Sequence, residues 1–193
     1  MAMTCPAGFD TERLGELVRA EYDRLAREPA GSFHFHRGPE YASRMLGYDP
    51  EELASIPAES TAAFSGVGNP QRIGRMLPGE AILDVGCGAG MDLILAARRI
   101  GRAGRAIGVD ITPSMIELAK RSALKAGLWE TIEVLRGSAE HMPVESRSID
   151  VVISNGALNL SPHKSSAFHE IYRVFKPGGR LHLADIVLQR ELS

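Results

Sequence analysis

The sequence is poor in cysteine, in long apolar runs and in clusters of basic residues. Its two cysteines, Cys5 and Cys87, stand in an N-terminal tail and in a glycine-rich segment, which indicates neither a disulfide framework nor a metal-ligand set. No uncharged run reaches the roughly 18 residues that a membrane-spanning helix needs. The net charge is −2 and the basic residues are scattered, which leaves no footprint for a nucleic-acid backbone. We therefore expect a soluble, cytoplasmic protein with no nucleic-acid or membrane partner.

Residues 1–78 have the apolar spacing of helices. Leu14, Val18 and Tyr22 recur at helical spacing between charged residues, which predicts an amphipathic helix over residues 10–28. Proline and glycine signals predict a second helix over residues 39–47 and a third from residue 50. We expect residues 1–78 to form a helical cap.

From residue 81 the pattern changes to short runs rich in valine and isoleucine, separated by helix-like stretches. Strands that alternate with helices imply a parallel sheet with right-handed crossovers. The sequence therefore predicts an α/β fold, in which a sheet-containing domain over residues 79–193 forms a single structural unit with the cap. The predicted strands are residues 81–85, 106–109, 132–135, 149–153 and 181–188.

A glycine-rich segment stands where the first strand should lead into the first helix. It reads DVGCGAG, with Asp84 followed by Gly86, Gly88 and Gly90. Glycine permits positive φ and lets the backbone approach a ligand closely, although such turns also serve helix packing. The dinucleotide fingerprint needs its third glycine at position 91, which is Met91 here. The spacing therefore disfavours NAD.

Asp110 ends the second predicted strand. An acidic residue at that point of a nucleotide-binding unit can accept hydrogen bonds from both ribose hydroxyls. The alternative is a carboxylate that favours the start of the next helix, at Thr112-Pro113, through the helix dipole. Together with the glycine-rich segment, Asp110 favours a nucleotide-like cofactor.

These motifs together resemble the class I S-adenosylmethionine methyltransferases, whose fold is Rossmann-like. Two further stretches carry the resemblance, GSAEHMP from Gly137 and RVFKPGGR from Arg173. The segments GNP from Gly68 and SNGALNLSP from Ser154 are similar to the arsenite methyltransferase branch. The resemblance covers roughly residues 12–190 and implies that S-adenosylmethionine is the cofactor.

The resemblance also implies a cofactor site. In it, the glycines face the methionine half with Asp84 supporting their loop, and Asp110 holds the ribose. Adenine lies between apolar side chains, with its amine near a polar segment in which Ser138 replaces the aspartate of many relatives. The implied residues are Asp84, Gly86, Cys87, Gly88, Gly90, Asp110, Ile111, Met115, Ser138, Ala139, Glu140, Asn155 and Tyr22.

Two members of this set are placed on the cap or beyond the fourth strand. Asn155 is expected to line the methionine end of the cofactor. Tyr22 resembles a tyrosine that closes over the cofactor in this branch, although a plain core contact is equally consistent with its position.

The chain departs from the arsenite branch at the cysteines that hold arsenic. The resemblance places Val67 and Gly156 at two of those positions, and neither can bind a soft ion as a thiolate does. We therefore predict a methyltransferase for a small-molecule acceptor, with arsenite disfavoured and quinone-like compounds open. The alternatives are a cofactor-binding protein or partner subunit without turnover, and an NAD-dependent oxidoreductase.

An aromatic segment precedes the second predicted helix. Phe33 and Phe35 alternate with His34 and His36, and with Tyr41 and Phe64 they suggest an apolar lid over the reacting sulfonium. A metal site would need a third ligand that the pattern does not place, so we predict no metal.

The fold that the resemblance implies normally carries two more strands after the fifth, whereas this sequence ends at Ser193. An apolar fifth strand would then present unpaired backbone groups to another chain. On this reading we expect a homodimer through the fifth strand, or a covered edge.

Overall fold

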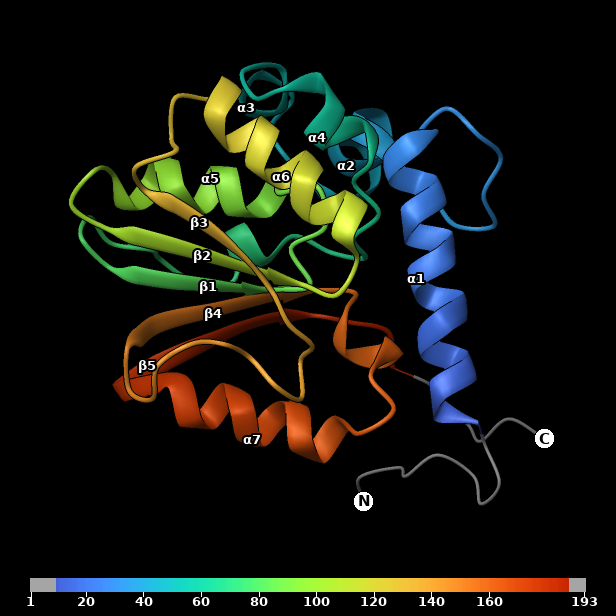
Figure 1. The fold of residues 1–193 in the computed structure, drawn as a ribbon. Helices are drawn as coiled ribbons and strands as arrows, with labels where there is room; N and C mark the ends of the chain where they lie inside the picture. The colour runs from blue at the N-terminus through green and yellow to red at the C-terminus, as the bar shows by residue number, and fades with distance from the viewer. Residues whose placement is uncertain (1–9, 188–193) are drawn as a thin grey trace.

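The computed structural model describes residues 10–187, which form one parallel sheet flanked by helices. The sheet has five strands in the order β3-β2-β1-β4-β5 (Figure 1). The strands are β1 Ala81–Val85, β2 Arg105–Asp110, β3 Ile132–Arg136, β4 Ile149–Asn155 and β5 Phe175–Ala184. The predicted α/β fold with a parallel sheet is confirmed.

The strands read as continuous apolar runs because helices cover both faces of the sheet. Helices α5 Met91–Ile100 and α6 Pro113–Lys125 lie on one face, and α7 Lys164–Val174 lies on the other (Figure 1). Within β1, Ile82 belongs to the core on the side of α5, while Leu83 belongs to the core on the side of α7. Successive residues of β1 therefore pack against the helices on opposite faces of the sheet.

The cap consists of short helices that precede the sheet. They are α1 Thr11–Arg27, α2 Gly38–Leu46, α3 Pro50–Ala54, α4 Ala58–Ala62 and the 3-10 turn η1 Pro70–Arg72. The predicted helix starts are present: Asp10 accepts from the Arg13 amide at 2.8 Å, and Asp49 accepts from the Glu51 amide at 2.8 Å. Gly47 ends α2 with φ +71°.

The cap and the sheet share one hydrophobic core. Tyr48, Leu53 and Phe64 of the cap are buried in the same cluster as Ile82 of β1 and Ile94 of α5. The division of the chain at residue 78 stays a prediction. Helix α1 stands across the open end of the sheet, beside the ends of the strands (Figure 1).

The fifth strand differs from its predicted range of residues 181–188. It begins at Phe175, directly after α7, where Phe175 pairs with Ile149 of β4. The register then shifts, and Arg180 pairs with Val151. The segment from Lys176 to Gly179 forms a bulge. Its proline and glycines are typical of a turn, so the predicted strand starts after them. Residue 188 lies outside the described residues.

Candidate cofactor-binding site

A cavity opens at the carboxyl ends of β1, β2 and β4. The strand order reverses between β1 and β4, since β2 and β3 lie on one side of β1 and β4 and β5 on the other. Connections leave the sheet in opposite directions at such a point, which creates a crevice where parallel α/β folds bind ligands. The topology therefore places the cavity where the glycine-rich segment ends β1.

All but one of the predicted site residues line this cavity. Gly90 is the exception. It occupies the N-cap of α5 with φ +86°, and a Cβ there would lie 3.3 Å from Ala119 Cβ on α6. Gly90 therefore lets α5 pack against α6, and the prediction that it faces the cofactor does not agree with its position in the structure.

The remaining two glycines of the segment have different roles. Gly86 has φ +75°, and an added Cβ would lie 2.3 Å from Ala157 Cβ, so glycine is required there by packing. Gly88 has φ +51°, and an added Cβ would meet no atom of residues 10–187 within 4 Å. A side chain at Gly88 would enter the cavity, so its absence leaves room for a ligand to approach the backbone.

Cys87 stands between these glycines, but its thiol is buried against the sheet. A Cβ on Gly108 of β2 would lie 2.7 Å from Cys87 Sγ. Burial raises the pKa of Cys87 well above its ordinary value, so its sulfur remains a neutral thiol.

The Asp110 carboxylate at the end of β2 connects the glycine segment to the next loop. Its Oδ2 accepts from the Gly88 amide and its Oδ1 accepts from the Thr112 amide, both at 2.8 Å. Each carboxylate oxygen has further lone pairs, so both can also accept from a ribose. Burial raises the pKa of Asp110, and the Thr112 and Gly88 amides oppose that rise. The Asp110 carboxylate therefore orders the loop and also lines the cavity, and its contact with a ribose stays a prediction.

The residues predicted near adenine lie on the loop after β2, in the first turn of α6 and on the loop after β3. Ile111 and the buried Met115 follow β2, and the segment from Ser138 to Glu140 follows β3. Glu140 is fixed because the Ser161 hydroxyl donates to its Oε1. This wall of the cavity combines the apolar side chains of Ile111 and Met115 with the polar side chains of Ser138 and Glu140.

Asn155, at the end of β4, joins the cap to the sheet. Its Oδ1 accepts from the amides of Val67 at 2.8 Å and Gly68 at 3.0 Å. Its Nδ2 donates to the Gly68 carbonyl at 2.8 Å and to Asp92 Oδ2 at 3.0 Å. Asn155 lines the cavity, and it also fixes the Val67 segment that faces Gly156. Its position at the methionine end of a cofactor stays a prediction.

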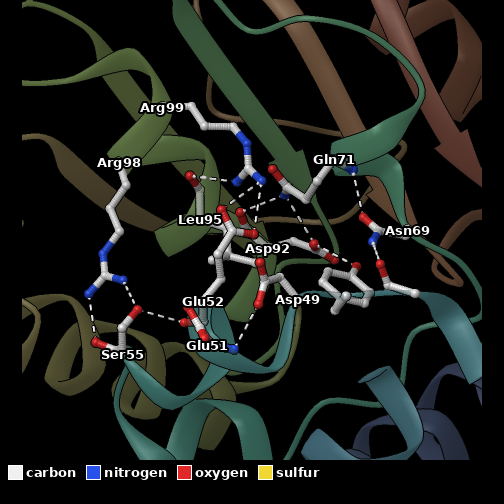
Figure 2. Close-up of polar contacts among 12 residues, drawn as sticks. Asp49, Glu51, Glu52, Ser55, Asn69, Gln71, Asp92, Leu95, Arg98 and Arg99 are labelled. Atoms are coloured by element: carbon white, nitrogen blue, oxygen red, sulfur yellow. Dashed lines mark hydrogen bonds and ion pairs between the residues drawn. The ribbon is translucent and has the colours of Figure 1, made fainter. Parts of the chain in front are cut away.

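Asp92, at the start of α5, is a cavity residue that the sequence reasoning missed. Its Oδ1 accepts from the Tyr48 hydroxyl at 2.7 Å and from Gln71 Nε2 at 3.0 Å. Figure 2 shows Gln71 directed at Asp92 from the cap. The available signal was an acidic residue in the first turn of the helix after a glycine-rich loop. Its partners are distant in sequence, which is why no pattern revealed them.

Two arginines on α5 hold the cap close to this network (Figure 2). Arg99 Nη2 contacts both carboxylate oxygens of Glu52 at 3.1 Å. Arg98 Nη2 donates to the Ser55 carbonyl at 2.7 Å. These contacts fix α3 against α5 and lie outside the cavity lining.

Helix α1 supplies the outer wall of the cavity. Gly15, Val18 and Tyr22 line it from one face of the helix. Burial raises the pKa of the Tyr22 hydroxyl, which therefore stays neutral. Tyr22 also packs against the cluster that contains Leu25 and Met115. Tyr22 therefore lines the cavity and also makes the core contact that was the alternative for it.

The predicted aromatic lid is only partly formed. Phe64 lines the cavity, whereas Phe33, Phe35 and Tyr41 do not. The Phe35 ring is stacked on Tyr22, with centroids 6.0 Å apart, and Phe33 lies 5.3 Å from Phe35. These rings support α1 from outside because the loop that carries them turns back onto that helix.

The charged lining of the cavity is acidic. It consists of Asp84, Asp92, Asp110 and Glu140. No lysine, arginine or histidine lines the cavity within residues 10–187. Such a site attracts cations and repels a pyrophosphate.

Two kinds of feature are not found in the part of the chain that the structure describes. It contains no group of three or more side chains suited to hold a metal ion. It also contains no helix that is long and apolar enough to span a bilayer. The two histidines considered as metal ligands have other contacts: His36 stacks on Tyr41 with centroids 5.1 Å apart, and His34 Nδ1 lies 3.8 Å from Glu21.

Comparison with known proteins identifies the class of the chain. Residues 77–193 match the methyltransferase domain family. The chain is 44% identical over 145 residues to an arsenite methyltransferase of Halobacterium salinarum, covering 75% of this chain and 37% of the relative. It is 39% identical over 105 residues to a demethylmenaquinone methyltransferase of Lactococcus lactis, covering 54% of this chain and 41% of the relative.

A solved structure agrees with these matches. The arsenic(III) S-adenosylmethionine methyltransferase of Chlamydomonas reinhardtii superposes with a TM-score of 0.68 at 36% identity, covering 74% of this chain and 50% of that one. The chain therefore belongs to the class I S-adenosylmethionine-dependent methyltransferase family, and that family implies S-adenosylmethionine as the cofactor. Within it, arsenite methyltransferases are among the similar curated relatives. The chain spans 37% to 45% of the length of the arsenite methyltransferases it matches first.

Proposed function

We propose that the chain binds S-adenosylmethionine in this cavity and transfers its methyl group to a small-molecule acceptor. The observation that carries the proposal is the acidic cavity at the glycine-rich end of β1, which no basic residue of the described chain lines. The cofactor is a cation, because its sulfonium and ammonium charges exceed its single carboxylate. A dinucleotide carries the opposite charge, so the site favours methyl transfer over hydride transfer.

The residues present fit this cofactor. Gly88 leaves space for the methionine half, and Asp110 presents two carboxylate oxygens to a ribose. The buried Oδ2 of Asp84 has no hydrogen-bond partner in residues 10–187 and lies where a positive group would be accommodated. When bound, S-adenosylmethionine supplies an electrophilic methyl group on a positively charged sulfur.

The chain's own contribution to such a reaction is alignment and exclusion of water. The apolar wall of Ile111, Met115 and Val18 holds the ligand away from solvent. Asn155 holds the Val67 segment opposite Gly156, which fixes the floor of the space left for the acceptor. A direct displacement needs no general base when the acceptor atom already carries a free lone pair.

The same floor argues against arsenite held by protein sulfur. A Cβ on Gly156 would lie 3.3 Å from Val67 Cγ1, so the two positions face each other, and both lack a thiol. Cys87 is the single cysteine of the described residues, and its buried thiol stays protonated. We propose that the acceptor is a small organic molecule and not arsenite.

Calorimetry tests the cofactor, and a radiolabel tests the transfer. We expect micromolar or tighter binding of S-adenosylmethionine and its demethylated product, and no binding of NAD. Incubation with methyl-labelled cofactor and a panel of small organic acceptors should transfer the label, whereas arsenite should not receive it. Absence of affinity for the cofactor would disprove the proposal, and label on arsenite would disprove the acceptor class.

A second candidate is a cofactor-binding protein or partner subunit without turnover. Binding without transfer to any acceptor in the panel would support it.

The homodimer through β5 also stays a prediction, supported by the position of β5 at an edge of the described sheet. Light scattering measures that state directly.

A further inference from the structure

Two buried carboxyl groups line the same cavity but differ in their hydrogen bonds. Asp92 accepts from Tyr48 at 2.7 Å, and from Gln71 and Asn155 at 3.0 Å each. The Oδ2 of Asp84 is buried without any hydrogen-bond partner among residues 10–187. Donors stabilise a carboxylate, whereas burial without donors stabilises the protonated acid. The surroundings therefore favour negative charge on Asp92 and a neutral Asp84.

Electrostatics act in the same direction. Burial, followed by the negative charges of Asp92 and Asp110, raises the pKa of Asp84 well above its ordinary value. Burial also raises the pKa of Asp92, but the donors from Asn155 and Tyr48 oppose that rise. Because two adjacent buried carboxyl groups resist ionising together, the one with donors ionises and the other keeps its proton.

Among residues 10–187, no nearby group compensates a charge on Asp84 in the free protein. The titratable groups that face it are Asp92 from α5, Asp110 from β2, Tyr48 from the cap and Cys87 from the glycine segment. Burial raises the pKa of Tyr48 and of Cys87, so both are neutral. The cavity lining of the described chain contains no basic side chain. A positive charge must therefore come from a ligand.

Resting on the proposed function, we propose that Asp84 is protonated in the free protein and ionises when S-adenosylmethionine binds. The O–H bond of the Asp84 carboxyl breaks, its proton leaves to the buffer, and the positive charge of the cofactor stabilises the resulting carboxylate. Binding and proton release are then thermodynamically linked.

The linkage has a defined sign. The bound state needs ionised Asp84, so affinity for the cofactor rises with pH up to the raised pKa of Asp84 and is constant above it. For one proton the rise is at most about tenfold per pH unit. A cavity in which Asp84 were already ionised would show no such rise.

Calorimetric titration of the full chain with S-adenosylmethionine measures the released proton. The same titration is run in pairs of buffers that differ in ionisation enthalpy and that buffer at the pH used, acetate and MES at about pH 5.5 and phosphate and imidazole at about pH 7. We expect the difference in heat to approach one released proton at the acidic end. Asp84→Asn should abolish the release and make affinity independent of pH. Asp150→Asn, at the opposite end of the sheet, should release protons like the wild type.

The outcomes separate this proposal from the function itself. Binding with equal heats in both buffers at every pH overturns proton release and leaves the proposed function intact. Absence of binding overturns the proposed function. If Asp84→Asn does not fold, infrared difference spectra of the wild type replace it. Loss of a protonated-carboxyl band on adding the cofactor is expected, and an unchanged band overturns the proposal.

Discussion

Acidic residues at the two ends of the parallel strands differ in whether the chain supplies them with a basic partner. At the amino ends, Asp150 forms an ion pair with Lys176 at 2.6 Å and accepts from the Ala81 amide at 2.8 Å. At the carboxyl ends, Asp84 and Asp110 line a cavity without basic residues in the described chain.

This difference separates stability from binding. At the amino ends the chain supplies its own counter-charges, so these acidic groups contribute to folding. At the carboxyl ends the acidic groups are buried without counter-charges, which costs folding free energy. A cationic ligand that binds beside these groups removes this unfavourable contribution, which then appears as favourable binding free energy. Substitutions at the two ends should therefore affect different measurements.

The largest effect is expected from Gly86→Val, on the free energy of unfolding. This variant tests whether each glycine at the carboxyl ends of the strands is needed for ligand binding or for packing. Its Cβ would lie 2.3 Å from Ala157 Cβ at φ +75°. Overpacking and the left-handed conformation should together destabilise the protein by about 3 to 5 kcal/mol in urea unfolding. Gly88→Ala, with no neighbour within 4 Å, should cost about 1 kcal/mol. Equal stabilities of the two variants would contradict this division of roles.

The next effect is on binding. Asp110→Ala removes the carboxylate that we expect to hold the ribose and that accepts from Gly88 and Thr112. Loss of two charge-assisted hydrogen bonds should weaken cofactor affinity by about 100-fold, or about 3 kcal/mol, in calorimetry. Asp150→Ala provides the matched control, because it removes an aspartate from the opposite end. An affinity of Asp110→Ala close to the wild type would show that the ribose is held elsewhere.

A smaller effect on stability is expected from Asp150→Ala itself. It leaves the Ala81 amide and Lys176 without their acceptor, which should cost about 1 to 2 kcal/mol of unfolding free energy and leave cofactor affinity unchanged. Burial raises the pKa of Asp150, but Ala81 and Lys176 outweigh it, so the pKa is lowered. The stabilisation is therefore present above the ordinary pKa of about 3.9 and is lost as pH falls below it. A wild-type advantage that grew on acidification would contradict this assignment.

The smallest effect is expected from Arg105→Ala, also at the amino ends. Arg105 pairs with Glu133 across β2 and β3, but both side chains are largely exposed, at 58% and 45%. Water and salt screen such a pair, so unfolding free energy should change by no more than about 0.5 kcal/mol. A change as large as that of Asp150→Ala would show that exposure does not distinguish the two pairs.

Local patterns in the sequence were sufficient for most of the secondary structure. β1 to β4 were predicted to within two residues at each end, because buried parallel strands carry apolar runs bounded by glycine or polar residues. β5 was misplaced because its early pairing at Phe175 depends on β4. Proline and glycine occur both in bulges and in turns, so the sequence of this segment alone did not distinguish a bulge in the strand from a turn before it.

The candidate site divides in the same way. The glycine segment and Asp110 could be found because strand ends and glycine spacing are local features. The partners of Asp92, which are Tyr48, Gln71 and Asn155, come from three separate elements. The different roles of Gly86, Gly88 and Gly90 also depend on which residue of another element lies opposite each one.

The sequence by itself determined the order of helices and strands and the parallel sheet, and it favoured a nucleotide-like cofactor. These follow from periodicity, glycine position and residue type, which act over a few residues. Only the tertiary structure decided which buried carboxyl has donors and which has none. That difference depends on distances between elements far apart along the chain, and burial turns it into a difference in charge.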